Sequence, residues 1–221
     1  LRKEAKAYQK EGETILNEFF KNEDILGYEG RVRELLGSDV TVFSPGENCR
    51  FTKFTLWGMF SWMEEWGNPH IDVIHWNTGI WDLHRCTADG ENFTLLDEFV
   101  DTNRRLAIQM ESYSENLIWA TITPGGRGLD RHEPINSLIN SVPDAKKVYL
   151  TDCEKPWNED VVRYNEAAAK LMRSRGIRVN DLYSELAEDT DRYISGDGIH
   201  PTEEGYERLA NAVAREIKAF L

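Results

Sequence analysis

Apolar residues recur along the chain with two periods, and the alternation of these periods predicts the secondary structure. Short runs rich in β-branched and aromatic residues are typical of buried strands. They predict strands at residues 39–43, 71–76, 117–122 and 177–179. Longer segments with an apolar residue every three or four positions are typical of helices that cover a core. They predict helices at residues 3–20, 28–36, 51–66, 93–113, 158–175, 182–188 and 203–220.

Strands that alternate with helices favour an α/β fold, a three-layer α/β/α sandwich with a parallel, flavodoxin-like sheet. The length of 221 residues fits a single domain with a well-buried core. Residues 1–26 are an atypical N-terminal helical segment of that domain. Residues 124–158 are a long loop with a weak strand signal at 148–150. A loop of that length in a compact domain is usually functional, so we expect it near the site.

Three polar loops are expected on one edge of the sheet. Right-handed crossovers between parallel strands place all the strand C-terminal ends on the same edge, where ligands bind. Residues 77–79 and 123–124 follow two of the predicted strands, and residues 197–200 fall on the same edge. We therefore expect Asn77, Asp197 and His200 around one cleft, with His200 partly exposed.

The turn from Asp197 to His200 places a carboxylate and an imidazole three residues apart, directly before the last predicted helix. An Asp near a His can hold the imidazole in one tautomer and stabilise the imidazolium that forms when the ring takes a proton. The residues that follow, Pro201, Thr202 and two glutamates, are also typical of an ordinary helix start. That interpretation explains the residues after His200 but not Asp197 and His200 themselves.

The segment Asp197-Gly-Ile-His-Pro, followed by Glu204-Gly-Tyr206, resembles the last sequence block of the SGNH (GDSL-type) hydrolases. In that family the Asp and His complete a Ser-His-Asp triad. Residues 71–84 resemble the family's middle strand and loop, where a Gly-x-Asn-Asp motif follows a buried strand. Here the motif is Gly79-Ile-Trp-Asp82, with Trp in place of Asn, and Asn77 is placed to supply the amide instead. The resemblance covers roughly residues 27–221.

The resemblance implies an ester hydrolase of the acyl or carbohydrate esterase type, with His200 as general base and Asp197 as the residue that orients it. It also implies an oxyanion hole. The loop at Asn48 and Cys49 would give a backbone N–H, and the loop at Asn77 and Gly79 would give a side-chain amide. An alternative for Asn77 is a turn residue that satisfies its own backbone.

The nucleophile is not identified by the sequence. The family carries its serine in a Gly-Asp-Ser motif, which this chain lacks, and counting back from Gly27 puts Glu23 or Asp24 near that position. Neither is a plausible acyl nucleophile in a Ser-His-Asp scheme. Ser44 is the best placed of the serines, and the thiol of Cys49 is an alternative. The other serines considered are Ser38, Ser137, Ser141 and Ser195.

Some neighbouring residues have two interpretations. Asp82 either supports the loop at 77–79 or faces water, and Trp76 or Trp81 is placed to stack on a sugar ring. His75 is expected to be packed within its strand. The remaining histidines show no ligand spacing for a metal, so no metal or cofactor is expected.

The net charge of −13 argues against binding to nucleic acid and to anionic membranes. No apolar run approaches the roughly 20 residues of a membrane span. Three cysteines without a CxxC pair favour reduced thiols and no structural zinc. We expect a cytoplasmic protein with a small-molecule ester or glycan as substrate. A secreted protein with its signal removed is the alternative, and the oligomeric state is left open.

Two further function classes compete with the ester hydrolase. One is a non-catalytic SGNH-like protein that binds a glycan or acyl ligand in the same cleft, which the missing Gly-Asp-Ser favours. The other is an interaction module whose N-terminal helix docks a partner. The Asp197–His200 pair favours the enzyme, because a pure binding protein has no obvious need for it.

Overall fold

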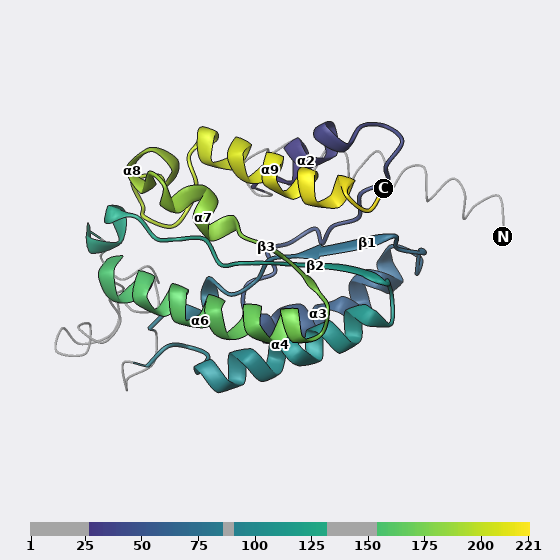
Figure 1. The fold of residues 1–221 in the computed structure, drawn as a ribbon, viewed down its shortest axis with the longest axis horizontal. Coiled ribbons are helices and arrows are strands. Elements are labelled where there is room, and N and C mark those ends of the chain that lie inside the picture. Colours follow the sequence, from purple (N-terminus) through teal and green to yellow (C-terminus); the bar gives the residue numbers. More distant parts are fainter. Residues whose placement is uncertain (1–26, 86–90, 132–153) are drawn as a thin grey trace.

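The computed structural model describes residues 27–85, 91–131 and 154–221 (Figure 1). Its centre is a parallel sheet with strand order β1-β2-β3. The strands are β1 (Val73–Trp76), β2 (Asn116–Ala120) and β3 (Arg178–Asn180). Ile74 lies opposite Leu117 and Ile118 opposite Arg178, which fixes the register of both pairs.

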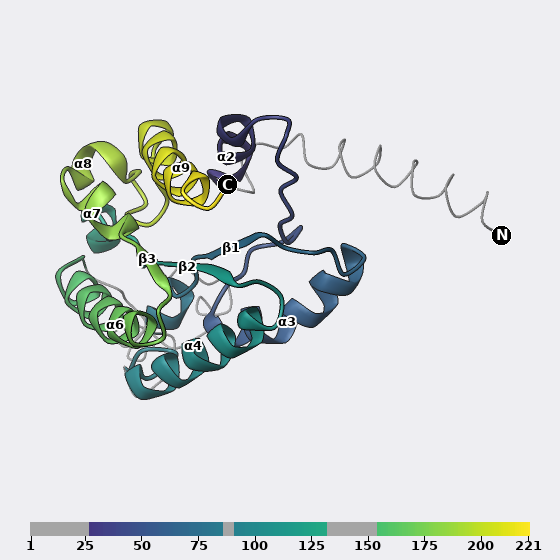
Figure 2. The same ribbon diagram turned by 45° about the vertical axis from the view of Figure 1, so that its right-hand side comes forward.

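Helices cover both faces of the sheet, as Figure 1 and the turned view in Figure 2 show. On one face lie α3 (Thr52–Glu65), α4 (Leu96–Glu111) and α6 (Glu154–Ser174). On the other face lie α2 (Glu29–Leu36), α7 (Leu182–Ala187), α8 (Thr190–Tyr193) and α9 (Glu203–Lys218). Two short 3₁₀ helices, η1 (Trp81–Leu83) and η2 (Arg127–Arg131), interrupt the loops after β1 and β2. The prediction of a three-layer α/β/α sandwich with a parallel sheet is confirmed.

Two apolar cores hold the layers together. The larger one, under α3, α4 and α6, includes the fully buried side chains of Phe99, Leu106 and Trp119. The smaller one, under α2 and α9, includes Leu209 and the small residue Ala120 of β2. Because β2 contributes Trp119 to one core and Ala120 to the other, its alternating side chains join the two layers.

The predicted strand at residues 39–43 is wrong, since these residues pair with no strand in the described part of the chain. The Arg33 guanidinium donates to the Val42 carbonyl at 2.7 Å, and Ser44 donates to Glu29. Phe43 packs against Trp66 at the end of α3, with 5.8 Å between ring centroids. Side chains of α2 thus bind polar groups of this segment, and its β-branched composition does not make it a strand.

Other boundaries shift by a few residues. Helix α6 begins at Glu154, so the long irregular loop ends before residue 158, and η2 and α8 were not predicted. The helix expected at 3–20 and the weak strand signal at 148–150 lie outside the described residues. None of the described helices combines the length and the apolar character that crossing a membrane requires.

His75 is half-buried in β1 and packs against Asn180 of β3, as predicted for a histidine within its strand. Its Nε2 lies 3.1 Å from Asn180 Nδ2. Because an amide nitrogen only donates, Nε2 is the acceptor and the ring proton sits on Nδ1. Burial lowers the pKa of His75 to about 4. The folded protein therefore favours the neutral ring above about pH 4.

Acid is expected to weaken the fold through His75. Below about pH 6.5 the unfolded chain binds a proton at this ring while the folded chain does not, until the pH reaches about 4. The free energy of unfolding should therefore fall by roughly 2 kcal/mol from this group between about pH 6.5 and 4.5. Urea unfolding at the two pH values measures it.

The control for this experiment is His75→Gln, which keeps an acceptor for Asn180 but does not titrate. The variant should lose less stability than the wild type over the same pH interval. His70→Gln, at an exposed position, should behave as wild type. If the free energy of unfolding falls equally in wild type and in His75→Gln, His75 is not the cause of the acid sensitivity.

Candidate active site

The turn between α8 and α9 holds Asp197 against His200. Asp197 Oδ2 lies 2.6 Å from His200 Nδ1. Asp197 Oδ1 accepts backbone hydrogen bonds from the Ile199 N–H at 2.8 Å and the His200 N–H at 2.9 Å. It also accepts the Ser195 hydroxyl at 2.8 Å. One carboxylate oxygen is thus fixed by the turn, and the other faces the imidazole.

These contacts keep Asp197 ionised. Burial raises the pKa of Asp197, but hydrogen bonds from the Ile199 N–H, from the ring and N–H of His200 and from the Ser195 hydroxyl lower it by more. The pKa of Asp197 therefore lies well below its ordinary range. The carboxylate accepts the Nδ1 proton, which leaves the Nε2 lone pair available as a base. The His200 side chain is 69% exposed, and nothing in the described part of the chain hydrogen-bonds Nε2.

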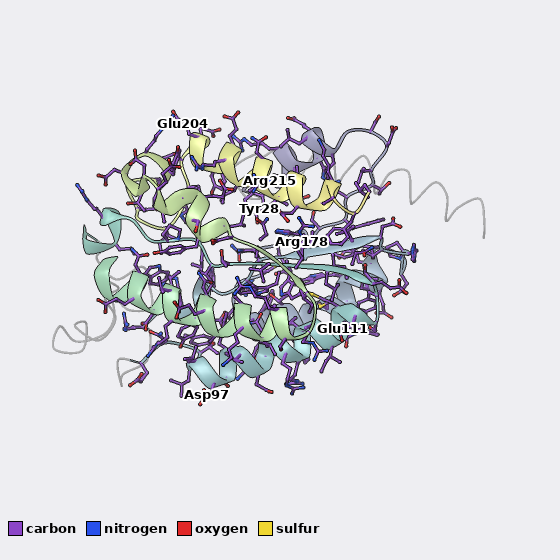
Figure 3. All side chains as sticks on the ribbon, viewed as in Figure 1. Tyr28, Asp97, Glu111, Arg178, Glu204 and Arg215 are labelled. Atoms are coloured by element: carbon purple, nitrogen blue, oxygen red, sulfur yellow. The ribbon has the colours of Figure 1, made fainter. Side chains whose placement is uncertain are left out.

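The flanking helices fix the two ends of this turn. Thr202 caps α9 by accepting the Gly205 N–H at 3.2 Å, and its own N–H donates to Tyr193 of α8 at 2.8 Å. Glu204, labelled at the first turn of α9 in Figure 3, pairs with Arg192 of α8. The helix-start interpretation of this sequence is therefore correct, and it is compatible with a site in the turn before it.

A pair of glycines lets the loop after β2 pack directly on the Asp197–His200 turn. The Gly126 N–H donates to the Gly198 carbonyl at 2.9 Å. A Cβ on Gly128 would lie 2.3 Å from Gly198 N, and a Cβ on Gly198 would lie 2.2 Å from Leu129 N. Gly198 also has a positive φ of 79°. Neither position accepts a side chain, so the two loops meet backbone to backbone.

Gly128→Ala is expected to separate these loops. The added methyl would clash with the backbone of Gly198, and relieving such overpacking typically costs about 1–3 kcal/mol. We expect a lower Tm in thermal unfolding. Gly30→Ala on α2 is the control, because a Cβ there has nothing within 4 Å, and it should leave the Tm unchanged or raise it. A Gly128→Ala variant as stable as wild type would contradict the backbone-to-backbone packing of these two loops.

Two asparagines of α6 hold the same loop and were missed by sequence reasoning. Asn165 accepts the Ile122 N–H at 2.8 Å and donates to the Ile122 carbonyl at 2.9 Å. Asn158 makes the same pair of bonds with Gly125, at 2.8 and 2.9 Å. Each amide pairs with the backbone as a neighbouring strand would. The only available signal was a pair of Asn residues seven apart, on one face of the helix.

Asn77 links the ends of β1 and β2. Its Nδ2 donates to the Thr121 carbonyl at 2.8 Å, so it does not satisfy its own backbone, and its second N–H has no acceptor within the described residues. Thr121 begins the loop whose Gly126 contacts the Asp197–His200 turn. Gly79 has a φ of 143°, and a Cβ there would lie 2.7 Å from Ile122 Cδ1. This loop therefore requires a glycine and packs against the same strand end.

The loop at Asn48 and Cys49 lies beside the loop at 77–79. Asn48 Oδ1 accepts the Arg50 N–H at 2.6 Å, which closes a tight turn. The Thr55 hydroxyl lies 2.9 Å from the Cys49 carbonyl and 3.2 Å from the Thr78 hydroxyl. Among the residues that the structure describes, the backbone N–H groups of Cys49 and Gly79 have no hydrogen-bond acceptor. Two neighbouring loops thus offer donors at this edge of the sheet.

No protein-family model and no curated protein matches the chain. Solved structures do match. The acetylxylan esterase Axe2 from Geobacillus stearothermophilus aligns with a TM-score of 0.62 and 18% identity, covering 86% of this chain and 80% of that one. A GDSL-like lipase from Bacteroides thetaiotaomicron aligns with a TM-score of 0.58 and 15% identity, covering 80% of this chain and 75% of that one.

The fold is that of the SGNH (GDSL-type) hydrolases. LAE5, an α/β hydrolase from the metagenome of Lake Arreo, also aligns, with a TM-score of 0.62, 15% identity and coverage of 88% of this chain and 83% of that one. Identities this low establish the fold alone. The roles of Asp197, His200, Asn77, Gly79, Asn48 and Cys49 within this SGNH fold remain predictions.

The nucleophile suggested by strand position, Ser44, is tied to α2. Its hydroxyl donates to Glu29 and lies 3.3 Å from the Arg33 guanidinium. The strand that was to place Ser44 at the sheet edge is also absent from the described part of the chain. Burial, with the charges of Glu47 and Glu29, raises the pKa of Cys49 to about 11, so its thiol is protonated at neutral pH. Neither residue is set up as a nucleophile.

The other serines divide into two groups. Ser195 donates to Asp197, on the side of the carboxylate away from His200 Nε2, and Ser38 is exposed in the turn after α2. Ser137 and Ser141 lie outside the described residues, as do Glu23 and Asp24. Across the described ranges, no hydroxyl or thiol hydrogen-bonds His200 Nε2. The SGNH fold is therefore present together with the Asp197–His200 contact, and the nucleophile is unassigned.

Asp82 is buried and joins the loop after β1 to the N-terminus of α3. Its two carboxylate oxygens accept the Thr52 hydroxyl at 2.7 Å and the Thr52 N–H at 2.8 Å, at the N-terminus of α3. Burial raises the pKa of Asp82, against hydrogen bonds from Thr94 and Thr52 that lower it. Trp76 is only 6% exposed and belongs to the core, so its predicted role in sugar stacking is wrong. Trp81 is 43% exposed and is accessible at the start of η1.

No group of three or more His, Cys, Asp or Glu within the described ranges could hold a metal ion. His84 lies instead against Trp157 of α6, with 5.1 Å between ring centroids.

Proposed function

We propose that the chain hydrolyses small acyl esters, O-acylated carbohydrates among them, with His200 as general base and Asp197 as the residue that orients it. The observation that carries the proposal is the 2.6 Å contact between Asp197 Oδ2 and His200 Nδ1, which leaves Nε2 open. The SGNH fold supports the ester class, since matching structures include an acetylxylan esterase and a GDSL-like lipase.

The chemistry follows from the positions of the polar groups. His200 Nε2 removes a proton from the attacking nucleophile and later returns it to the leaving alcohol. The carbonyl oxygen of the ester takes the negative charge in between. The free N–H of Asn77 and the backbone N–H groups of Cys49 and Gly79 are the donors assigned to that oxyanion.

Substrate preference is proposed from charge and exposure. A chain with a net charge of −13 disfavours polyanionic substrates such as nucleic acid and anionic membrane surfaces. Neutral acetylated sugars carry no such penalty. The exposed ring of Trp81 supports stacking on a pyranose.

A second function, binding without catalysis, is favoured by one observation. The described residues place no hydroxyl or thiol on His200 Nε2, so a glycan or acyl ligand could occupy the same edge without being cleaved. The same fold serves both functions, and only the chemistry separates them.

Hydrolysis and binding assays distinguish the two. Saturable release of acetate from acetylated xylo-oligosaccharides, or of p-nitrophenol from p-nitrophenyl acetate, supports the esterase. Calorimetric binding of the oligosaccharides without release of acetate supports the binding protein. A serine-directed phosphonate and a thiol reagent, each followed by mass spectrometry, identify a covalent nucleophile where there is one.

A further inference from the structure

Ser195 lies at the centre of the Asp197–His200 turn through three separate bonds. Its N–H donates to the His200 carbonyl at 2.7 Å, and its carbonyl accepts the Gly198 N–H at 3.0 Å. Its hydroxyl donates to Asp197 Oδ1 at 2.8 Å. The neighbouring residues Ile194 and Pro201 form an antiparallel bridge that closes the turn. The backbone of Ser195 therefore maintains the turn, while its hydroxyl, among the residues that the structure describes, bonds to the carboxylate alone.

The hydroxyl adds a third donor to the two backbone N–H groups that already bind Asp197 Oδ1. The N–H groups of Ile199 and His200 come from the chain after Asp197. Ser195 comes from the chain before it. With three donors from two separate stretches of chain, Oδ1 is held in place, rotation of the carboxylate is restricted, and Oδ2 stays on His200 Nδ1.

We propose that Ser195 is a positioning residue for the Asp197–His200 pair, whose hydroxyl holds the carboxylate in the orientation that keeps the ring proton of His200 on Nδ1. The effect of Ser195 on catalysis rests on the proposed function, whereas its effect on the tautomer of His200 does not. It also assigns to Ser195 a task other than that of a nucleophile.

The test is the tautomer of His200 in ¹⁵N-labelled protein, because ring nitrogen chemical shifts separate the Nδ1–H and Nε2–H forms of a neutral imidazole. His200→Gln identifies the signals. In wild type we expect the Nδ1–H form to dominate. In Ser195→Ala the ratio of Nδ1–H to Nε2–H should fall by about tenfold, as expected for losing one hydrogen bond to a charged group.

Two variants control the experiment. Ser195→Thr keeps the hydroxyl and should restore the wild-type tautomer ratio. Ser184→Ala removes a similar bond, from the Ser184 hydroxyl to Asp181 at 2.6 Å in α7, and should leave His200 unchanged. The backbone bonds of Ser195 do not depend on its side chain, so Ser195→Ala should fold, with a Tm lowered by no more than the loss of that one hydrogen bond.

Kinetics then connect the tautomer to turnover. For p-nitrophenyl acetate, Ser195→Ala should lower kcat about tenfold and change KM by less than about twofold, because the base is impaired and the substrate contacts are not. An unchanged tautomer ratio in Ser195→Ala would overturn the inference even if the protein is an esterase. A shifted ratio in a protein that hydrolyses no ester would uphold the inference and reject the proposed function.

Discussion

Replacing His200 with alanine is expected to lower kcat/KM for p-nitrophenyl acetate by at least about a thousandfold. Nε2 is the ring nitrogen of His200 that Asp197 does not contact, and the described part of the chain places no other base beside it. The His200 side chain is 69% exposed, so its removal leaves little cavity, and the Tm should stay close to wild type. The loss would then be one of chemistry and not of folding.

The matched control is His70→Ala. His70 is also an exposed histidine near an aspartate, with 3.6 Å between its Nε2 and Asp72 Oδ1. It precedes β1 and so lies at the edge of the sheet opposite the Asp197–His200 turn. His70→Ala should keep full activity. A His200→Ala variant that hydrolyses the ester as fast as His70→Ala would contradict the assignment of the base.

Asp197→Asn is expected to lower kcat by about 10³–10⁴-fold while the turn stays folded. The carbonyl oxygen of the new amide should take the place of Oδ1, because three donors converge there. The amide nitrogen must then face His200 Nδ1. Because that nitrogen donates, Nδ1 becomes an acceptor and the ring proton moves to Nε2, where it blocks the base.

The control for this substitution is Asp189→Asn. Asp189 caps α8 by accepting the Arg192 N–H, and asparagine is an equally good helix cap. That variant should retain wild-type turnover, measured in the same assay. An Asp197→Asn enzyme with more than about a tenth of wild-type kcat would show that the carboxylate does not set the tautomer.

The sequence could predict the Asp197–His200 contact because it is local. A spacing of three residues in a turn with Gly198 places the two side chains within reach of each other. The strand β1 and the helices on either side of it were also predicted, the strand from a short apolar run and the helices from apolar residues at helical spacing. Elements and contacts formed by residues a few positions apart in the chain were therefore predicted from the sequence.

Contacts between distant segments were not predicted, because no local pattern encodes them. The Asn77 amide donates to the Thr121 carbonyl, 44 positions away, and the Asn165 amide donates to the Ile122 carbonyl, 43 positions away. The segment at 39–43 has the composition of a strand, but its partners are side chains of α2. Trp76 ends a strand next to the site, yet it faces the core, which only the packing of the helices decides.

The most direct measurement is chemical rescue of His200→Gly with imidazole. If His200 is the base and Asp197 orients it, added imidazole should restore hydrolysis of p-nitrophenyl acetate in proportion to its concentration. The exposed position of the ring leaves room for it to enter. The double variant Asp197→Asn/His200→Gly should show only the reaction of imidazole in buffer. Rates in His200→Gly that never exceed that of imidazole alone would contradict the account.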